Sequence, residues 1–323
     1  MPDRTVLVLG CGMAGVFAAL ELKRRLRHER VVVIDKAPMA SYPPSHAALA
    51  VGEVRGRTLL RPRSRLARKG IEFVNAEVQH IDLAARQVRA AGGREVRFDL
   101  LVLATGTEPA FDAIPGLSDN FQSTVTFESA ERLAASLRYF AGGRVLIATA
   151  ADPKWAPGPY ELAMLLEHYF HERKMRQKVE IGVAAPEDSP LARFGPEASE
   201  LIAGQLAHKG IEFLAQSRLA AVDAHRHLAR FEDGGERSFD LLITLPPQTA
   251  PPPLVECGLV DPSGRVPVDP MTLETSTPGV FALGDVSGLR AADGRLAPAS
   301  AELARQSAVA VARQAAARFN GTA

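Results

Sequence analysis

The chain has 323 residues, a formal net charge of +1 and only two cysteines. This length suits two domains rather than one core, and the interspersed charges give no reason to expect a nucleic-acid partner. Two cysteines exclude a disulfide framework. The longest uncharged stretch, Thr5 to Leu20, contains three glycines and falls short of the roughly 20 apolar residues of a membrane span. No transmembrane segment or secretory signal is predicted, and a cytoplasmic location is expected.

A strand of β-branched and leucine residues is predicted at 5–9, and it leads directly into the glycine fingerprint of residues 10–15. After a strand, glycines at this spacing allow a tight turn, the close approach of a pyrophosphate and the packing of helix on strand. A second strand, 31–34, ends at Asp35, which is placed to accept hydrogen bonds from adenosine ribose hydroxyls. These features predict a dinucleotide site. Asp35 in place of an arginine disfavours a ribose 2′-phosphate, but Lys36 follows it directly and weakens this point.

The densest basic stretch follows this strand. Its arginines alternate with apolar residues, which is more typical of a solvated face than of a phosphate-binding track. They are Arg55, Arg57, Arg61, Arg63, Arg65 and Arg68.

The sequence then repeats itself. Residues 69–73, Lys-Gly-Ile-Glu-Phe, return at 209–213, and residues 98–101, Phe-Asp-Leu-Leu, return at 239–242. Both offsets match the length of one nucleotide-binding domain, so we predict two similar domains in tandem.

The second copy has lost the features of a nucleotide site. Its first strand, 144–148, leads into Ala-Thr-Ala-Ala-Asp-Pro with no glycine, and Asp152 there would repel a phosphate. Its second strand, 179–183, is followed by Ala184, Ala185 and Pro186, which offer no carboxylate to a ribose. The sequence therefore predicts no tightly recognised nicotinamide nucleotide.

Two further buried strands close on small-residue turns, at 98–106 with Ala-Thr-Gly and at 277–285 with Gly-Asp. The order of fingerprint, Ala-Thr-Gly and Gly-Asp resembles the two-dinucleotide-binding flavoproteins of the pyridine nucleotide-disulfide oxidoreductase superfamily. This resemblance implies an α/β fold of two tandem Rossmann-like dinucleotide-binding domains, as in the glutathione reductase-like FAD/NAD(P)-binding fold, with the second inserted in the first. It also implies FAD as cofactor, with Asp285 bonded to its ribityl chain.

The resemblance further implies a discontinuous FAD-binding domain of residues 1–107 and 268–323, around a degenerate NAD(P)-binding-like domain of residues 108–267. An alanine-rich helix is predicted from Ala299 to about Phe319, and its positive N-terminus would face the flavin. Many relatives carry a lysine just before this helix, which this chain lacks. The cofactor-binding residues implied are Gly10, Cys11, Gly12, Met13, Ala14, Gly15, Asp35, Lys36, Pro44, Val78, Ala104, Thr105, Gly106, Gly284, Asp285 and Ala299.

The segment Pro157-Gly158-Pro159-Tyr160-Glu161 is similar to one in sulfide:quinone oxidoreductases and flavocytochrome c sulfide dehydrogenases, which also lack a nicotinamide site. Members that oxidise sulfide carry a cysteine two residues before this element and a second near the C-terminal part of the flavin site. Here Ala156 stands at the first position and no cysteine follows Cys257. Both cysteines are interpreted as buried small residues, and the redox pair is predicted to be absent.

We therefore expect an FAD-dependent oxidoreductase of this branch that transfers electrons without a cysteine pair. Glu161 is the candidate catalytic acid or base, with a simple helix-terminal charge as the equal alternative. No metal site is predicted, because His168 and His171 have no third ligand. The expected partner is a small-molecule or protein electron donor and acceptor, with a cytochrome or a quinone among them, and a homo-oligomer stays open. The chain ends soon after the last predicted helix, and this weakens the expectation of a quinone reductase.

Two alternatives stay open beside this hypothesis. One is a flavin-binding or partner-docking protein with reduced catalysis, which would suit the missing cysteines and lysine. The other is an enzyme resembling type II NADH dehydrogenase.

Overall fold

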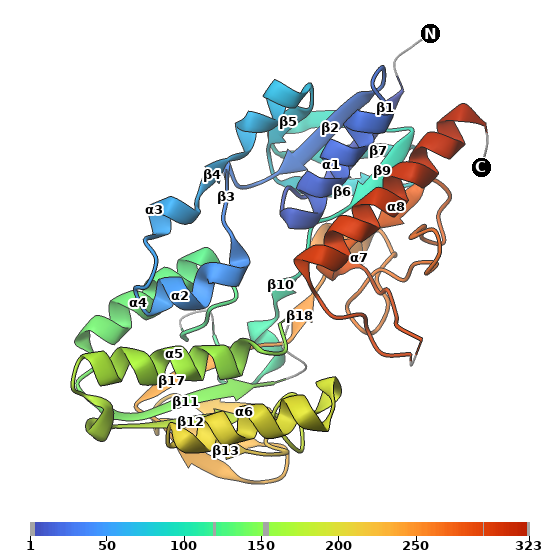
Figure 1. Ribbon diagram of the computed structural model, residues 1–323. Coiled ribbons are helices and arrows are strands. Elements are labelled where there is room, and N and C mark those ends of the chain that lie inside the picture. Colours follow the sequence, from blue (N-terminus) through green and yellow to red (C-terminus); the bar gives the residue numbers. More distant parts are fainter. Residues whose placement is uncertain (1–3, 119–120, 151–154, 293, 322–323) are drawn as a thin grey trace. The chain divides into compact units, whose positions relative to one another are not determined.

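The computed structural model describes residues 4–118, 121–150, 155–292 and 294–321. The chain forms two compact units, one of residues 1–41, 61–108 and 248–323 and the other of residues 42–60 and 109–247. Each unit is a parallel sheet with its longer helices on one face and a small antiparallel sheet on the other, as Figure 1 shows. The predicted α/β fold with two tandem Rossmann-like units is confirmed.

The first unit contains a five-stranded parallel sheet in the order β19-β9-β1-β2-β5. Alternate residues of its strands point to opposite faces, so one set packs on α1 and α8 and the other on the antiparallel strands β6, β7 and β8 and on α7. The bounds are β1 (Thr5–Leu9), α1 (Met13–Arg25), β2 (Arg30–Asp35), β5 (Glu72–Asn75), β6 (Val78–Asp82), β7 (Gln87–Ala90), β8 (Arg94–Arg97), β9 (Leu100–Leu103), α7 (Pro252–Glu256), β19 (Val280–Ala282) and α8 (Ala301–Asn320).

The second unit repeats this plan with four parallel strands in the order β13-β12-β11-β17. Helices α2, α4, α5 and α6 pack on one face, and β14, β15 and β16 cover the other. The bounds are α2 (His46–Ala50), α3 (Gly56–Leu59), α4 (Phe127–Tyr139), β11 (Gly143–Thr149), α5 (Gly158–Glu172), β12 (Val179–Ala184), α6 (Pro196–His208), β13 (Ile211–Leu214), β14 (Leu219–Asp223), β15 (Leu228–Phe231), β16 (Glu236–Ser238) and β17 (Leu241–Leu245).

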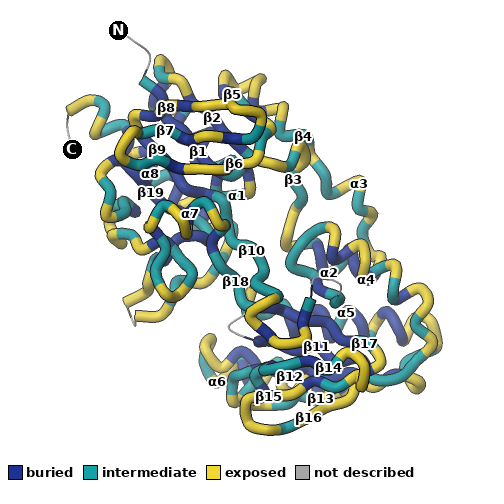
Figure 2. The backbone as a smooth tube through the Cα atoms, turned by 180° about the vertical axis from the view of Figure 1, so that it is seen from behind, coloured by how far each residue is buried: buried dark blue, intermediate teal, exposed yellow. Residues whose placement is uncertain are grey.

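Short elements complete the chain. The strands are β3 (Met39–Ala40), β4 (Arg61–Pro62), β10 (Glu108–Pro109) and β18 (Gln248–Thr249). The 3₁₀ turns are η1 (Pro43–Ser45), η2 (Arg63–Lys69), η3 (Ala91–Gly93), η4 (Phe111–Ala113), η5 (Arg176–Lys178), η6 (Ala192–Phe194) and η7 (Gly284–Val286). In Figure 2 the central strands of both sheets are buried along most of their length. Within the described residues, no helix is both long and apolar enough to cross a bilayer.

The repeated sequence produces repeated bonds. Asp99 accepts a hydrogen bond from the backbone N–H of Thr5 at 2.7 Å, and its own N–H donates to the Thr5 carbonyl. In the second unit, Asp240 makes the same two bonds with Arg144, the first again at 2.7 Å. Each aspartate thus fixes the start of the central strand of its unit, which explains why the Phe-Asp-Leu-Leu motif occurs twice.

The compact units differ from the predicted domain limits by more than one residue in two places. Residues 42–60 belong to the second unit, because helix α2 packs on α4 and α5. Residues 248–267 belong to the first unit, because Leu254 and Val266 are buried in its core.

Candidate functional site

Three predicted motifs meet at the carboxyl ends of the first unit's strands. The N–H of Gly10 donates to Ile34 at the end of β2, and that of Ala104 donates to Leu9 at the end of β1. The N–H of Leu283 donates to Leu103 at the end of β9. Parallel sheets bind ligands at this edge, where the order of strands reverses direction, and here the reversal lies between β1 and β9.

The glycines of these motifs let the segments touch. A Cβ on Gly10 would lie 2.4 Å from the carbonyl oxygen of Ala104, and one on Gly15 would lie 1.9 Å from that of Gly10. A Cβ on Gly284 would lie 2.7 Å from the Cβ of Ala14. The fingerprint, the Ala-Thr-Gly turn and the Gly-Asp turn are therefore packed together at the start of α1.

The N-terminus of α1 is open toward solvent. Its N-cap, Gly12, has no side chain to bond the first N–H groups, and the first turn contains no acidic residue. A Cβ on Gly12 would meet nothing within 4 Å. By contrast, α8 is capped by Ser300 and carries Glu302 in its first turn. Unbonded N–H groups with the positive helix end and free space in front suit a pyrophosphate, so this part of the site fits FAD.

Asp35 lies at the end of β2 and is largely buried. Its carboxylate accepts hydrogen bonds from the N–H groups of Cys11 at 2.6 Å and Ala37 at 2.8 Å, and it forms an ion pair with Arg63. The solvated-face interpretation is wrong for Arg63, whose side chain is only 11% exposed. The alternating spacing of the arginines does not reveal that Arg63 is bonded to Asp35, because the hydrogen bonds of Arg63 reach residues more than 25 positions away.

Lys36 is exposed and bonded to carboxylates. Its Nζ lies 2.8 Å from Glu108 and 3.8 Å from Glu77, and the hydrogen bond to Glu108 raises the pKa of the lysine. The ammonium group is therefore already neutralised by protein carboxylates, which does not favour a ribose 2′-phosphate.

Asp285 is half-buried in η7, on a turn held by the preceding loop. The N–H of Val266 donates to the carbonyl of Val286 at 2.9 Å, and that of Gly288 donates to Val266 at 2.7 Å. Burial lowers the pKa of Arg265, while Asp285 and Asp261 oppose this shift by attraction. Arg265 is thus a cation close to Asp285 that the sequence did not single out.

The remaining predicted cofactor residues are spread more widely. Met13 and Ala14 open α1, while Thr105 and Gly106 follow β9 and are half-buried. Val78 begins β6, and Ala299 immediately precedes the N-cap of α8. Pro44 is exposed in η1 and belongs to the second unit, so it does not share the first unit's core.

The second unit lacks these features at the equivalent edge. Pairing of β12 with β13 places Ala185 where the first unit has Asp35, and Thr149 occupies the position of Gly10. The Tyr160 hydroxyl donates to Glu187 just beyond β12, and burial together with this bond raises the pKa of Tyr160. A buried tyrosine and its carboxylate therefore lie beside the end of β12. The predicted repulsion by Asp152 falls outside the described residues.

Glu161 lies in the first turn of α5 and is exposed. Trp155, 49% exposed, lies against the start of the same helix, because a Cβ on Gly158 would meet its ring at 3.4 Å. These facts place the candidate acid and the only tryptophan at one helix end, and both interpretations of Glu161 stay open.

Neither cysteine is prepared for thiolate chemistry. Cys11 is fully buried, and burial raises its pKa to about 11. Cys257 is half-buried, donates its thiol to the carbonyl of Leu254 at 3.3 Å, and also has a raised pKa. At neutral pH both are thiols, and the thiolate is the nucleophile.

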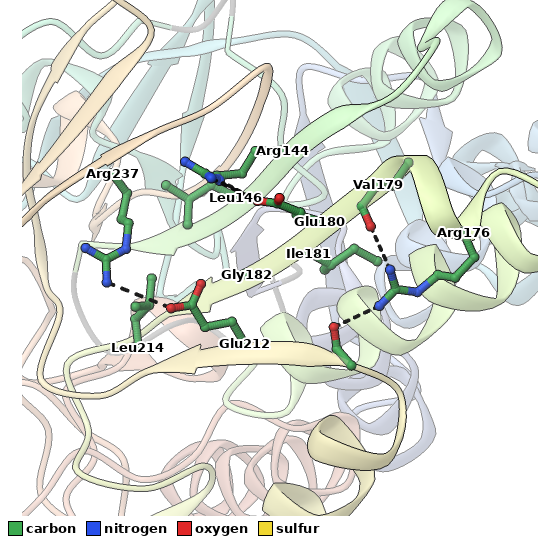
Figure 3. Close-up of a pocket in the computed structure, with 11 residues that line it drawn as sticks. Arg144, Leu146, Arg176, Val179, Glu180, Ile181, Gly182, Glu212, Leu214 and Arg237 are labelled. Atoms are coloured by element: carbon green, nitrogen blue, oxygen red, sulfur yellow. Dashed lines mark hydrogen bonds and ion pairs between the residues drawn. The ribbon is translucent and has the colours of Figure 1, made fainter.

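A separate hollow of about 230 Å³ lies on the sheet of the second unit. Figure 3 shows the residues that line it. Gly182 pairs with Glu212 there as Val32 pairs with Glu72 in the first unit. The hollow thus lies at the position that the side chain of Val32 fills in the first unit.

The charged side chains that line this hollow are bonded to one another or to the backbone. Arg144 lies 2.9 Å from Glu180, and Arg237 lies 3.8 Å from Glu212. Arg176 donates to the carbonyl groups of Val179, Lys209 and Gly210. This arrangement favours a space left by a small residue over a ligand site. Among the described residues, no cluster of three metal-binding side chains occurs.

The geometry agrees with comparisons to known proteins. The family model of the pyridine nucleotide-disulphide oxidoreductases matches residues 4–154 and 159–310, nearly the whole chain. The chain belongs to this family. Its members are FAD-dependent oxidoreductases.

The curated relatives include sulfide:quinone oxidoreductases, a probable ferredoxin reductase and NADH dehydrogenase-like proteins. The chain is 25% identical over 299 residues to the mitochondrial sulfide:quinone oxidoreductase of Mus musculus, covering 88% of this chain and 66% of the relative. It is 27% identical over 225 residues to the sulfide-quinone reductase of Aquifex aeolicus (strain VF5), covering 68% and 52%. The chain therefore spans less than two thirds of these relatives.

A solved structure confirms the fold. The sulfide:quinone oxidoreductase from Aquifex aeolicus superimposes with a TM-score of 0.90 at 23% identity, over 99% of this chain and 78% of that one. The predicted resemblance to this branch is confirmed, and the chain's two cysteines agree with a missing redox pair.

Proposed function

We propose that this protein is an FAD-dependent oxidoreductase whose first unit holds the FAD. The observation that carries the proposal is the packing of three motifs at the open N-terminus of α1, where Gly10 contacts Ala104 and Gly284 contacts Ala14. Free space before Gly12 supports it, because a Cβ there would meet no protein atom. Family membership makes FAD the expected dinucleotide.

Different residues of the site would bind different parts of the cofactor. The N–H groups at the start of α1 would bind the pyrophosphate, Asp35 a ribose hydroxyl and Asp285 the ribityl chain. When bound, FAD supplies the redox chemistry, while the protein supplies binding, orientation and electrostatics. Gly12, Asp35 and Asp285 are therefore binding residues rather than redox groups.

Electrons would pass between donor and acceptor without a cysteine relay. Both thiols have raised pKa values and are buried or half-buried, so neither offers a nucleophile. Glu161, exposed in the first turn of α5, is the proposed proton-transfer group. The relatives' names make sulfide a candidate donor and a quinone a candidate acceptor. A cytochrome is a further candidate acceptor.

A second candidate is a flavin-binding protein that docks a partner without turning over sulfide. Ala156 favours it, because the resemblance implies a cysteine at this position in members that oxidise sulfide. The two candidates differ in whether sulfide reduces the bound flavin.

The test is the visible spectrum of the purified protein during anaerobic addition of sulfide. A flavin spectrum that bleaches supports the oxidoreductase with a sulfur donor, and an unchanged spectrum supports the second candidate. Asp285→Ala should purify with little flavin. Asp269→Ala is the matched control, because the Asp269 carboxylate accepts its hydrogen bonds from Met271 and Thr272 of its own turn in the same unit. Full flavin content in Asp285→Ala would contradict the proposed site.

A further inference from the structure

Arg63 joins the glycine loop to the end of β2. Its Nη1 donates to Asp35 and, at 2.7 Å, to the carbonyl oxygen of Ala37. Its Nε donates at 3.1 Å to the carbonyl oxygen of Cys11 in the glycine loop. One nearly buried guanidinium group therefore fixes the two segments that a dinucleotide's adenosine half would contact.

The same contacts determine how many acceptor positions of the Asp35 carboxylate stay available to a ligand. Its Oδ2 accepts the Cys11 N–H, while its Oδ1 accepts the Ala37 N–H and the Arg63 guanidinium. A carboxylate has about four acceptor positions, so one is left, on Oδ2. Without Arg63, a largely buried carboxylate would stand unpaired beside the place where a pyrophosphate brings further negative charge.

The second unit offers an internal comparison. Ala185 stands there in the position of Asp35, so no carboxylate needs a counterion. The segment before its Lys-Gly-Ile-Glu-Phe repeat is the helix α6 (Pro196–His208), whereas the first unit has the turn η2 that begins with Arg63. The acid and its cation are therefore both missing from the copy that has lost the glycine fingerprint.

We propose that Arg63 is a positioning residue of the dinucleotide site. It holds the Asp35 carboxylate on the glycine loop, leaves it one acceptor position for an adenosine ribose hydroxyl, and offsets its charge next to the pyrophosphate. The inference rests on the proposed function, because it requires an adenine dinucleotide in the first unit. Nη2 of Arg63 donates to no residue that the structure describes.

The experiment measures binding of FAD to the apoprotein by quenching of flavin fluorescence, with ADP as a competitor that reports the adenosine half alone. In Arg63→Met we expect FAD and ADP to bind roughly ten- to a hundredfold more weakly, as for the loss of charge-assisted hydrogen bonds. Adding Asp35→Asn to this variant should recover part of the affinity, because it removes the uncompensated charge. Arg94→Met is the matched control, since Arg94 pairs with Glu72 in the same unit.

The melting temperature of each apoprotein separates positioning from folding. Wild-type affinity for FAD and ADP in Arg63→Met overturns this inference and leaves the proposed function standing. A lowered melting temperature with no recovery in the double variant also overturns it, because it assigns Arg63 a purely structural role. Failure of the wild-type protein to bind FAD overturns the proposed function, and this inference with it.

Discussion

Cys11 lies in the glycine loop, where a reactive thiol would have chemical consequences. Its side chain is fully buried, and desolvation raises its pKa from 9.0 to about 11, partly opposed by Arg63. The burial interpretation made from sequence thus holds for this residue. Because the folded state keeps the thiol protonated, folding stability from this group is complete below pH 9 and is lost as the pH rises from 9 to 11.

Replacing Cys11 should therefore change the alkaline limit of the protein. The raised pKa corresponds to a loss on the order of 2–3 kcal/mol between pH 9 and pH 11. Cys11→Ala should flatten this part of the curve of unfolding free energy against pH, as measured by urea denaturation. Cys257→Ala is the comparison and should flatten the curve less, because the Cys257 thiol is only half-buried although burial raises its pKa too. Identical slopes for wild type and Cys11→Ala would exclude titration of this thiol.

At the scale of elements, we expect opposite effects from adding a methyl group to two glycines at the start of α1. A Cβ on Gly15 would lie 1.9 Å from a backbone oxygen, whereas one on Gly12 would meet nothing within 4 Å. Gly15→Ala should destabilise the fold on the order of 3 kcal/mol. Gly12→Ala should cost less than about 1 kcal/mol yet weaken FAD binding, because its methyl group occupies ligand space.

Thermal melting and FAD titration of both variants check this pair. The critical result is Gly12→Ala, because its fold should stay intact. Unchanged FAD affinity in that variant would mean that the pyrophosphate does not approach this turn.

The hollow in the second sheet gives a third prediction. Gly182 stands in an extended strand, and an added Cβ would lie 3.6 Å from Leu146, an ordinary contact. Gly182→Ala should therefore raise unfolding free energy by about 0.5–1 kcal/mol through reduced chain entropy. Gly116→Ala is the opposite control, because its φ is +79° and its Cβ would lie 1.8 Å from a carbonyl oxygen. A lower melting temperature for Gly182→Ala would show that the hollow has a structural role.

Sequence reasoning predicted the elements with local signals. The glycine fingerprint, the buried strands and the Lys-Gly-Ile-Glu-Phe repeat each depend on neighbouring residues, and the fold contains them. The role of Arg63 is not predictable in this way, because its partners are distant in sequence. The sequence predicts residues 42–60 in the first domain, because nothing in them reveals that α2 packs on α4 and α5.

At the scale of the molecule, duplication followed by divergence explains why one unit fits a nucleotide and the other does not. The two units share strand order, the antiparallel cover and the aspartate that fixes the central strand. They differ at the carboxyl edge, where the second unit has Thr149 and Ala185 in place of a glycine and an acid. The shared features stabilise the fold, and the altered ones belong to ligand binding.

NADH should therefore reduce this protein poorly, although the flavin itself is reducible. Buried Tyr160 and half-buried Glu187 lie beside the end of β12, and position 185 has no carboxylate to accept hydrogen bonds from ribose hydroxyls. We expect slow flavin reduction that rises linearly with NADH up to millimolar concentration, measured anaerobically by stopped-flow absorbance. Dithionite in the same sample is the control for a reducible flavin. Fast reduction that saturates at micromolar NADH would mean that the second unit binds the nucleotide through contacts other than those of the first.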